Sequence, residues 1–163
     1  MATGRPTLYL LCGKIAAGKS TLAKRLAERP RTVLIAEDHW NSNLFKEELQ
    51  TIDDYTRYSK RLRNAMGPHV VALLKAGTSV VLDFQANTRA VRGWMRGIIE
   101  ESGSAHELHL LDIPDLICRQ RMHERNALGE HPFKLTDADF ETFTRYFAPP
   151  TPDEGFNVVV HTA

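Results

Sequence analysis

The nine residues Gly13-Lys14-Ile15-Ala16-Ala17-Gly18-Lys19-Ser20-Thr21 constrain the fold of this chain more than any other feature. They match the pattern G-x-x-x-x-G-K-[ST] without a mismatch, and they lie between an apolar stretch at 7–12 and a helix-like stretch at 19–28. Glycines let the backbone between a strand and a helix curl, so that successive N–H groups point inward. The sequence therefore predicts a P-loop, a turn that surrounds a polyphosphate.

The residue types in this loop indicate how the phosphates would be held. Lys19 is expected to reach the β- and γ-phosphates, and the Ser20 hydroxyl is expected to ligate Mg²⁺. The positive end of the following helix also attracts anions. The predicted nucleotide-binding set is Gly13, Lys14, Ala16, Ala17, Gly18, Lys19, Ser20 and Thr21. The ligands expected from this pattern are ATP and Mg²⁺.

Short apolar stretches alternate with helix-like stretches along the rest of the chain, which is typical of an α/β fold with a parallel sheet. The predicted strands are residues 7–12, 32–36, 79–84, 107–113 and 157–161. The predicted helices are residues 19–28, 53–66, 68–77, 88–101, 116–126 and 136–147, with a break at Gly67-Pro68. Right-handed crossovers would place helices on both faces of the sheet. We therefore expect one three-layer α/β/α domain over residues 1–163, with a five-stranded parallel sheet.

Composition excludes several other classes of protein. The chain is 42% hydrophobic and 25% charged with a net charge of +1, which argues against a disordered chain, a nucleic-acid partner and an anionic membrane. Only Cys12 and Cys118 are present, so no disulfide framework is expected. No apolar run approaches the ~20 residues of a membrane span. We expect a cytoplasmic protein, and the sequence leaves its oligomeric state open.

Carboxylates follow two of the predicted strands, where ligands bind in sheets of this type. Asp38 is the candidate general base for an acceptor hydroxyl, with Glu37 as second choice, although either could be a helix N-cap or a solvated loop acid. Asp83 ends an apolar strand and is the candidate Mg²⁺ ligand beside Ser20. Asp112 fits the same pattern, but the strand that carries Asp83 is expected to lie beside the P-loop strand.

The acceptor is expected to meet the segment 39–66 beyond Asp38. Residues 39–41 are predicted to continue as a loop. Aromatic residues follow that could line an acceptor pocket or belong to the core; they are Trp40, Phe45, Tyr55 and Tyr58.

Arginines on the helix predicted at 116–126 suggest a short helical lid at about 118–136. Arg121 and Arg125 are four residues apart and share a helix face, where their guanidinium groups could stabilise a transferring phosphoryl group. The loop with Gly129 and Pro132 could let the segment close over a nucleotide. The alternative is a solvated basic helix face, which is favoured for Arg119.

These motifs together resemble the AAA_33 group of small P-loop kinases, which is akin to polynucleotide 5′-kinase, chloramphenicol phosphotransferase and the zeta toxins. The resemblance covers essentially the whole chain and rests on GKIAAGKST at 13–21, AED at 36–38, VVLDFQANTRAVRGW at 80–94 and CRQRMHERN at 118–126. It implies the P-loop role for Gly13, Gly18, Lys19 and Ser20, the base role for Asp38, and lid roles for Arg121 and Arg125.

The resemblance breaks down after the base, because polynucleotide kinases carry an arginine three residues later and this chain carries Asn41. Three functions remain after this comparison. The favoured one is transfer of the ATP γ-phosphate to a hydroxyl of a small-molecule acceptor. The others are a polynucleotide 5′-hydroxyl kinase and a non-catalytic regulatory module that depends on a nucleoside triphosphate.

Overall fold

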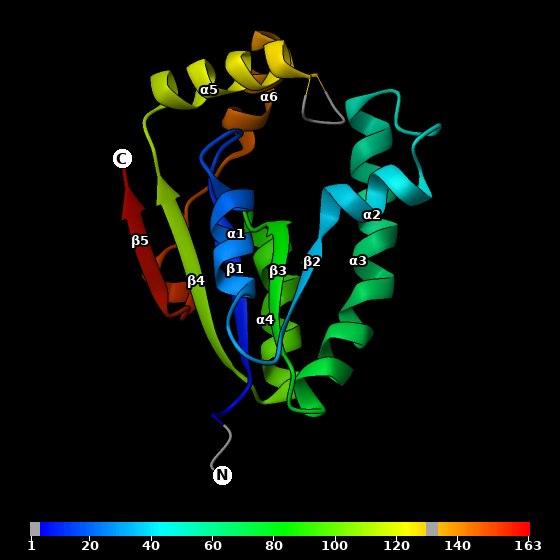
Figure 1. Cartoon of the computed structure of the whole chain (residues 1–163), viewed down its shortest axis with the longest axis vertical. Coiled ribbons are helices and arrows are strands. Elements are labelled where there is room, and N and C mark those ends of the chain that lie inside the picture. The colour runs from blue at the N-terminus through cyan, green and yellow to red at the C-terminus, as the bar shows by residue number, and fades with distance from the viewer. Residues whose placement is uncertain (1–3, 130–133) are drawn as a thin grey trace.

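The computed structural model describes residues 4–129 and 134–163, and it contains a five-stranded sheet in the order β2-β3-β1-β4-β5 (Figure 1). All neighbouring strands in the sheet are parallel. The strands are β1 (Thr7–Cys12), β2 (Thr32–Ala36), β3 (Ser79–Gln85), β4 (Ala105–Asp112) and β5 (Val158–Thr162). The predicted α/β class and parallel sheet are therefore confirmed, with strand ends shifted by two residues or fewer.

Helices cover both faces of the sheet and also lie across its carboxyl edge (Figure 1). They are α1 (Lys19–Ala27), α2 (Glu37–Leu44), α3 (Ile52–Lys75), α4 (Arg89–Ser102), α5 (Asp115–Leu128) and α6 (Asp137–Tyr146). One apolar cluster lies between the sheet and α1, and a larger one lies between the sheet and the pair α3 and α4. A third cluster joins the P-loop to α5 and α6. The helices α5 and α6, which lie over the carboxyl edge, thus pack directly on the P-loop.

The predicted break at Gly67-Pro68 is wrong, because α3 runs unbroken from Ile52 to Lys75 with Pro68 inside it. A proline within a helix costs about 3 kcal/mol through a lost hydrogen bond and a steric clash. Pro68 lies on the exposed side of the helix, where water can satisfy the freed carbonyl group. On the buried side, a Cβ at Gly67 would lie 3.1 Å from Trp94 Nε1, so α3 and α4 pack closely at this point. The packing of α3 on α4 therefore outweighs the tendency of Gly67-Pro68 to break the helix.

The predicted loop at 39–41 is also wrong, because α2 begins at Glu37 directly after β2. Glu37 and Asp38 form the acidic first turn of this helix, where carboxylates interact favourably with the helix dipole. The side chain of Asn41 is fully buried and donates a hydrogen bond to Ser59 Oγ at 3.1 Å, which fixes α2 on α3. The helix holds both carboxylates at the carboxyl edge of the sheet.

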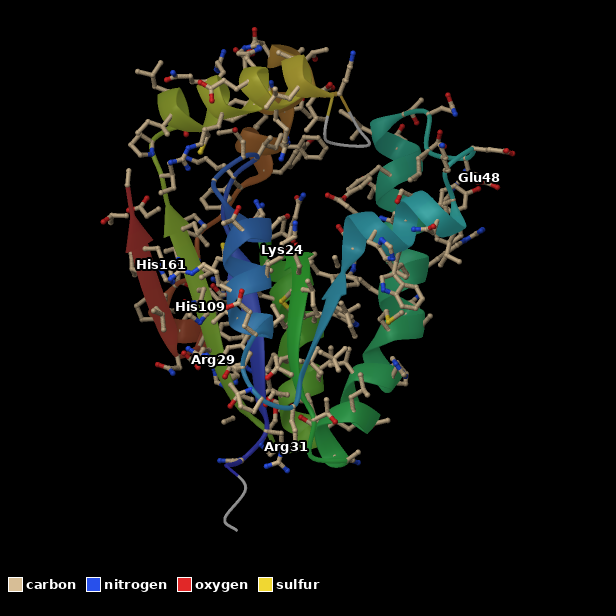
Figure 2. The ribbon with its side chains drawn as sticks, in the orientation of Figure 1. Lys24, Arg29, Arg31, Glu48, His109 and His161 are labelled. Atoms are coloured by element: carbon tan, nitrogen blue, oxygen red, sulfur yellow. The ribbon has the colours of Figure 1, made fainter. Side chains whose placement is uncertain are left out.

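The strands β4 and β5 form the side of the sheet away from β2, and they bring two histidines together (Figure 2). His109 Nδ1 lies 2.8 Å from His161 Nε2, and the rings stack with centroids 5.1 Å apart. Within the described ranges, no helix is both long and apolar enough to cross a membrane.

Candidate nucleotide site and adjoining cavity

The backbone of the P-loop has the left-handed turns that inward-facing amides require. Gly18, which caps α1, has a φ of 106°, and Ala16 has a φ of 60°. The Ala17 N–H donates to Lys14 O at 3.1 Å and closes the turn. A Cβ at Gly13 would lie 3.2 Å from both Ala17 Cβ and Leu111 Cβ, so a larger residue there would press on the loop. Two of the loop's glycines are thus required by backbone conformation and by space.

Asn87 fixes the start of the loop from the neighbouring strand connection. Its Oδ1 accepts from Gly13 N at 2.9 Å, and its Nδ2 donates to Gly13 O at 2.8 Å. This pair satisfies both backbone groups of one residue, as a further sheet residue would. The neighbouring Thr88 caps α4 by accepting from Val91 N at 3.2 Å. No local pattern marks the contact of Asn87 with a residue 74 positions away.

Lys19 lies inside the curl of the loop. Its Nζ donates to Gly13 O at 2.5 Å and to Lys14 O at 2.7 Å. Burial lowers the pKa of Lys19, and the Asp83 carboxylate opposes that shift. Lys14 differs, because its ammonium group pairs with Asp115 and lies 5.4 Å from the centre of the Phe147 ring. Lys14 therefore contributes its backbone to the loop while its side chain ties the loop to α5.

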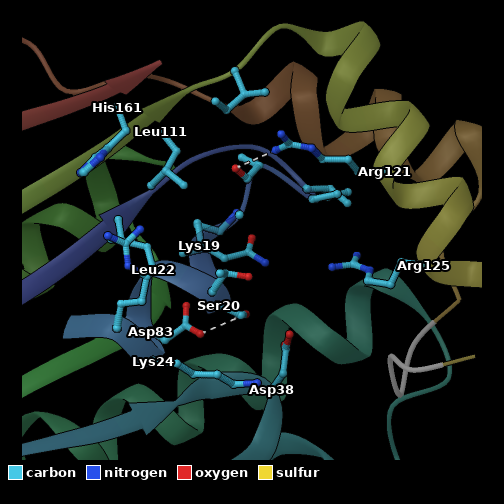
Figure 3. Close-up of a pocket in the computed structure, with 18 of the residues that line it drawn as sticks. Lys19, Ser20, Leu22, Lys24, Asp38, Asp83, Leu111, Arg121, Arg125 and His161 are labelled. Atoms are coloured by element: carbon cyan, nitrogen blue, oxygen red, sulfur yellow. Dashed lines mark hydrogen bonds between the residues drawn. The ribbon is translucent and has the colours of Figure 1, made fainter. Parts of the chain in front are cut away.

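Asp83 and Ser20 meet at the mouth of the loop. Ser20 Oγ donates to Asp83 Oδ2 at 3.2 Å (Figure 3). Ala36 of β2 pairs with Asp83 of β3, so the acidic first turn of α2 follows directly beside this carboxylate. Burial raises the pKa of Asp83, with the charge of Lys19 opposing that shift. A buried carboxylate beside a hydroxyl presents the hard oxygen ligands that Mg²⁺ takes together with waters and phosphate oxygens. The residues present fit that ion.

A cavity of about 800 Å³ brings these residues together with the predicted base and the lid arginines. Figure 3 shows Arg121 and Arg125 reaching toward it from α5, and Asp38 approaching from α2. Arg121 Nη1 donates to Ala17 O at 3.4 Å. Arg125 Nε is buried and has no hydrogen-bond partner among the described residues; burial lowers the pKa of Arg125, while the charge of Asp38 raises it.

Two other predictions concern Arg119 and the closing of the lid. The sequence favours a solvated helix face for Arg119. In the structure, however, Arg119 forms ion pairs at 3.8 Å with Asp137 and Glu141. It also lies over the Phe140 ring, so it joins α5 to α6. Residues 130–133, including Pro132 of the predicted lid loop, lie outside the described residues. Closure of the segment 118–136 stays a prediction.

A second cavity of about 270 Å³ adjoins the first. Both cavities are lined by Ile15, Glu37 and Gln85. Glu37 is only 5% exposed, and Tyr55 donates a 2.6 Å hydrogen bond to its Oε1. Burial raises the pKa of Glu37 to about 7, against the opposing effects of the Tyr55 bond and the Arg63 charge. Four aromatic residues are candidates for either the acceptor pocket or the core. Tyr55 lines this cavity, Phe45 and Tyr58 pack on each other with centroids 4.8 Å apart, and Trp40 is exposed.

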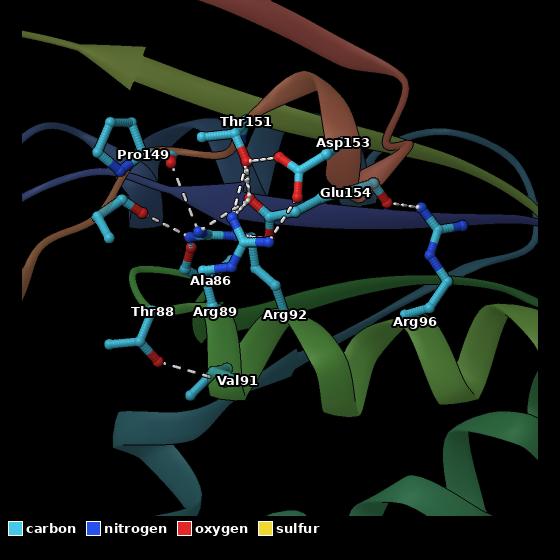
Figure 4. Close-up of polar contacts among 11 residues, drawn as sticks. Ala86, Thr88, Arg89, Val91, Arg92, Arg96, Pro149, Thr151, Asp153 and Glu154 are labelled. Carbon is cyan, nitrogen blue, oxygen red and sulfur yellow. Dashed lines mark hydrogen bonds and ion pairs between the residues drawn. The ribbon is translucent and has the colours of Figure 1, made fainter.

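A buried arginine of α4 joins that helix to the chain that follows α6 (Figure 4). Arg92 of α4 is 1% exposed and forms an ion pair with Glu154 at 2.7 Å. Its Nη1 also donates to Ala86 O at 2.9 Å and to Ala148 O at 2.7 Å. The chain after α6 is thereby tied to α4, and Phe147, at the start of that chain, lines the second cavity. Sequence reasoning assigned no role to Arg92.

The fold and the loop define a P-loop protein of the α/β class. A family model, AAA_33, described as "AAA domain", matches residues 8–150, and the chain belongs to this family. The resemblance noted from the motifs is thus confirmed. A search of the curated proteins found no match.

Solved structures with the same fold include several kinases. A protein of Chloroflexus aurantiacus assigned as a kinase is 20% identical, with a TM-score of 0.77 over 99% of this chain and 87% of the other. A sugar kinase from a Janibacter species is 18% identical, with a TM-score of 0.68 over 98% and 86%. The APS kinase of Mycobacterium tuberculosis, solved with AMPPNP and APS, is 19% identical, with a TM-score of 0.63 over 96% and 88%. A chain of an RNA repair complex also matches, over 45% of its own length.

Proposed function

We propose that this protein is an ATP-dependent phosphotransferase that moves the γ-phosphate of Mg·ATP to a hydroxyl group of a small-molecule acceptor. The observation that carries the proposal is the shared cavity, in which the P-loop, Ser20, Asp83, Asp38 and the two arginines of α5 face one another. Membership of the AAA_33 family and the kinase folds of the structural neighbours support it.

The residues around the cavity suit in-line transfer of a phosphoryl group. Lys19 and the loop amides would hold the β- and γ-phosphates. Asp38 would accept the proton of the acceptor hydroxyl, while the acceptor oxygen bonds to the γ-phosphorus. The bond from that phosphorus to the bridging oxygen breaks, and its electron pair leaves with ADP. Arg121 and Arg125 would stabilise the charge on the transferring group.

Mg²⁺ is part of this proposal, with Ser20 and Asp83 as the protein ligands. The ion would neutralise phosphate charge when bound. Among the described residues, no group of three or more His, Cys, Asp or Glu side chains is placed to hold a metal. A hydroxyl and one carboxylate nevertheless match the usual Mg²⁺ site, in which substrate phosphates and water supply the other ligands.

A small acceptor is favoured over the 5′ end of a nucleic acid because a confined cavity of about 270 Å³ adjoins the nucleotide site. The position three residues after Asp38 is the fully buried Asn41, which holds α2 on α3, so no arginine is present there to meet a polynucleotide phosphate. The match to a chain of an RNA repair complex makes 5′-hydroxyl oligonucleotides the necessary comparison substrate. We also infer a cytoplasmic location, which two buried free cysteines support.

The role of Asp38 can be tested with Asp38→Asn, using Asp53→Asn in the first turn of α3 as the matched control. We expect Asp38→Asn to bind Mg·ATP with a dissociation constant within about threefold of the wild type and to lose transfer by at least about 100-fold, the scale of general-base catalysis. Calorimetry measures binding, and γ-labelled ATP with an acceptor panel measures transfer. Full turnover in Asp38→Asn would remove the base assignment.

A further inference from the structure

We propose that the second cavity selects an uncharged cyclic polyol, a ring that carries another hydroxyl group besides the one that is phosphorylated. This inference rests on the phosphotransferase function proposed above and adds the chemical class of its acceptor. It is carried by the position of the cavity, the balance of its charges, the Glu37–Tyr55 pair and its apolar wall.

The position of the second cavity is that of an acceptor site. Ile15, Glu37 and Gln85 line both cavities, so a molecule in the smaller one faces the nucleotide site across these side chains. Glu37 and Asp38 are consecutive residues in the first turn of α2, and Asp38 lines the larger cavity. A hydroxyl group presented at this boundary would approach Asp38 and the γ-phosphate together.

Each of the two cationic side chains that line the second cavity, Lys14 and Arg63, lies near a carboxyl group. Lys14 forms an ion pair with Asp115. Arg63 lies near enough to Glu37 for its charge to oppose the rise in that carboxyl's pKa. An anionic acceptor would therefore meet the carboxyl group of Glu37, and that of Asp38 at the boundary with the larger cavity, while Lys14 is already paired with Asp115. A cationic acceptor would meet Arg63 and Lys14. An uncharged molecule avoids repulsion from the carboxyl groups and from the cations alike.

Glu37 is a carboxyl group in this cavity that can recognise a second hydroxyl. Its Oε1 accepts the Tyr55 hydroxyl at 2.6 Å, which holds the carboxyl group in one orientation. A carboxyl group has two oxygens that can each accept hydrogen bonds, so the Tyr55 bond leaves it with capacity for a ligand hydroxyl. A carboxyl group held in one orientation favours a ligand that donates a hydrogen bond to it. An acceptor with two hydroxyl groups could place one against Glu37 and the other against Asp38.

The opposite wall favours a ring of limited size. Phe143, Phe147 and Val91 give that wall apolar surface that can cover the face of a ring. Phe143 also meets Tyr55 edge to face, with centroids 6.4 Å apart, so the apolar wall joins the polar one. A cavity of about 270 Å³ lies below the usual range for drug-sized ligands, about 300–1,000 Å³. Compact rings fit this volume, and long polymers do not.

The test uses the full-length protein with γ-labelled ATP and three acceptor arms at equal concentration. The neutral arm is glucose, myo-inositol and adenosine; the anionic arm is gluconate, glucose 6-phosphate and AMP; the cationic arm is glucosamine. We expect phosphorylation of at least one neutral member, at least tenfold faster than any charged member. Mass spectrometry of the product identifies the phosphoester.

A matched pair of variants connects that activity to the cavity. Ala90→Trp places an indole at the exposed second residue of α4, where Ala90 lines the cavity, and Ala138→Trp makes the same change at the exposed second residue of α6, away from it. We expect Ala90→Trp to raise the acceptor KM at least tenfold, with the dissociation constant of Mg·ATP unchanged within twofold. Ala138→Trp should alter neither quantity. Tyr55→Phe, which removes the hydroxyl that orients Glu37, should raise the acceptor KM more than it lowers kcat.

The possible results separate a failure of the proposed acceptor class from a failure of the phosphotransferase function. Faster transfer to a charged acceptor, or an acceptor KM that Ala90→Trp leaves unchanged, overturns the acceptor class while the phosphotransferase function stands. If no arm is phosphorylated, saturation-transfer NMR of the neutral arm with Mg·AMPPNP decides, and absence of binding overturns the inference. Binding of Mg·ATP without transfer to any acceptor, the oligonucleotide included, counts against the proposed function itself.

Discussion

Glu37 should make the stability of this protein depend on pH in a way that one substitution removes. Its carboxyl group is 5% exposed, and burial raises its pKa from 4.5 to about 7. The folded state therefore holds this proton more tightly than the unfolded chain does. The stability that Glu37 contributes is fully present below the unfolded pKa and is lost as the pH rises through the folded pKa. Glu37→Gln keeps an uncharged side chain of the same shape and should remove this loss.

The size of the effect follows from the two pKa values. A shift from 4.5 to about 7 corresponds to roughly 3 kcal/mol at 1.36 kcal/mol per pKa unit. Between about pH 5 and about pH 8, about 2.5 kcal/mol of this falls within an accessible range. We expect the unfolding free energy of Glu37→Gln, minus that of the wild type, to rise by about this amount across the range. Urea unfolding followed by circular dichroism at several pH values measures it.

Glu48→Gln is the control, because Glu48 is exposed on the connection between α2 and α3 (Figure 2). Its difference from the wild type should stay within about 0.5 kcal/mol at every pH, as for most surface changes. A difference for Glu37→Gln that is equally flat would refute the reasoning, since it would mean that the carboxyl group ionises as it does in the unfolded chain. A difference that falls with pH would refute it as well.

Three further substitutions test the site and its supports. Asn87→Ala removes both hydrogen bonds to Gly13 and should lower the unfolding free energy by about 1–3 kcal/mol and weaken Mg·ATP binding; a wild-type urea midpoint would contradict this. Arg92→Ala removes the nearer of the two arginines that pair with Glu154, together with its hydrogen bonds to Ala86 O and Ala148 O, and should cost about 3–5 kcal/mol, measured in the same way, whereas a loss under 1 kcal/mol would mean that the pair is not needed. Arg125→Ala should lower kcat about 100-fold or more with little change in nucleotide affinity, and an unchanged kcat in a labelled-ATP assay would remove Arg125 from the mechanism.

Local sequence signals predicted most of the fold. The strands β1 and β2 match their predicted ranges, because runs of apolar residues between breakers specify buried strands without help from distant contacts. The predicted start of a helix at 136 also matches α6, whose N-cap Thr136 forms a capping box with Asp139. The continuity of α3 could not be predicted, since proline tolerance at Pro68 depends on close packing of Gly67 on Trp94 from another helix.

The candidate site likewise contains residues that the sequence predicts and contacts that it does not. The P-loop residues are recognisable because neighbouring positions carry the whole motif. The bonds of Asn87 to Gly13 and of Tyr55 to Glu37 join residues 74 and 18 positions apart, and no spacing rule predicts them. The raised pKa of Glu37 is equally a product of the folded surroundings, because burial is its main cause.

A crystal structure with Mg·AMPPNP tests the central claim most directly. Lys19 Nζ now donates to the carbonyl groups of Gly13 and Lys14. The account predicts that Nζ turns to the β- and γ-phosphates, that the amides of residues 13–20 surround them, and that Mg²⁺ lies between Ser20 and Asp83. Phosphates bound elsewhere, with Lys19 still on those carbonyl groups, would contradict it.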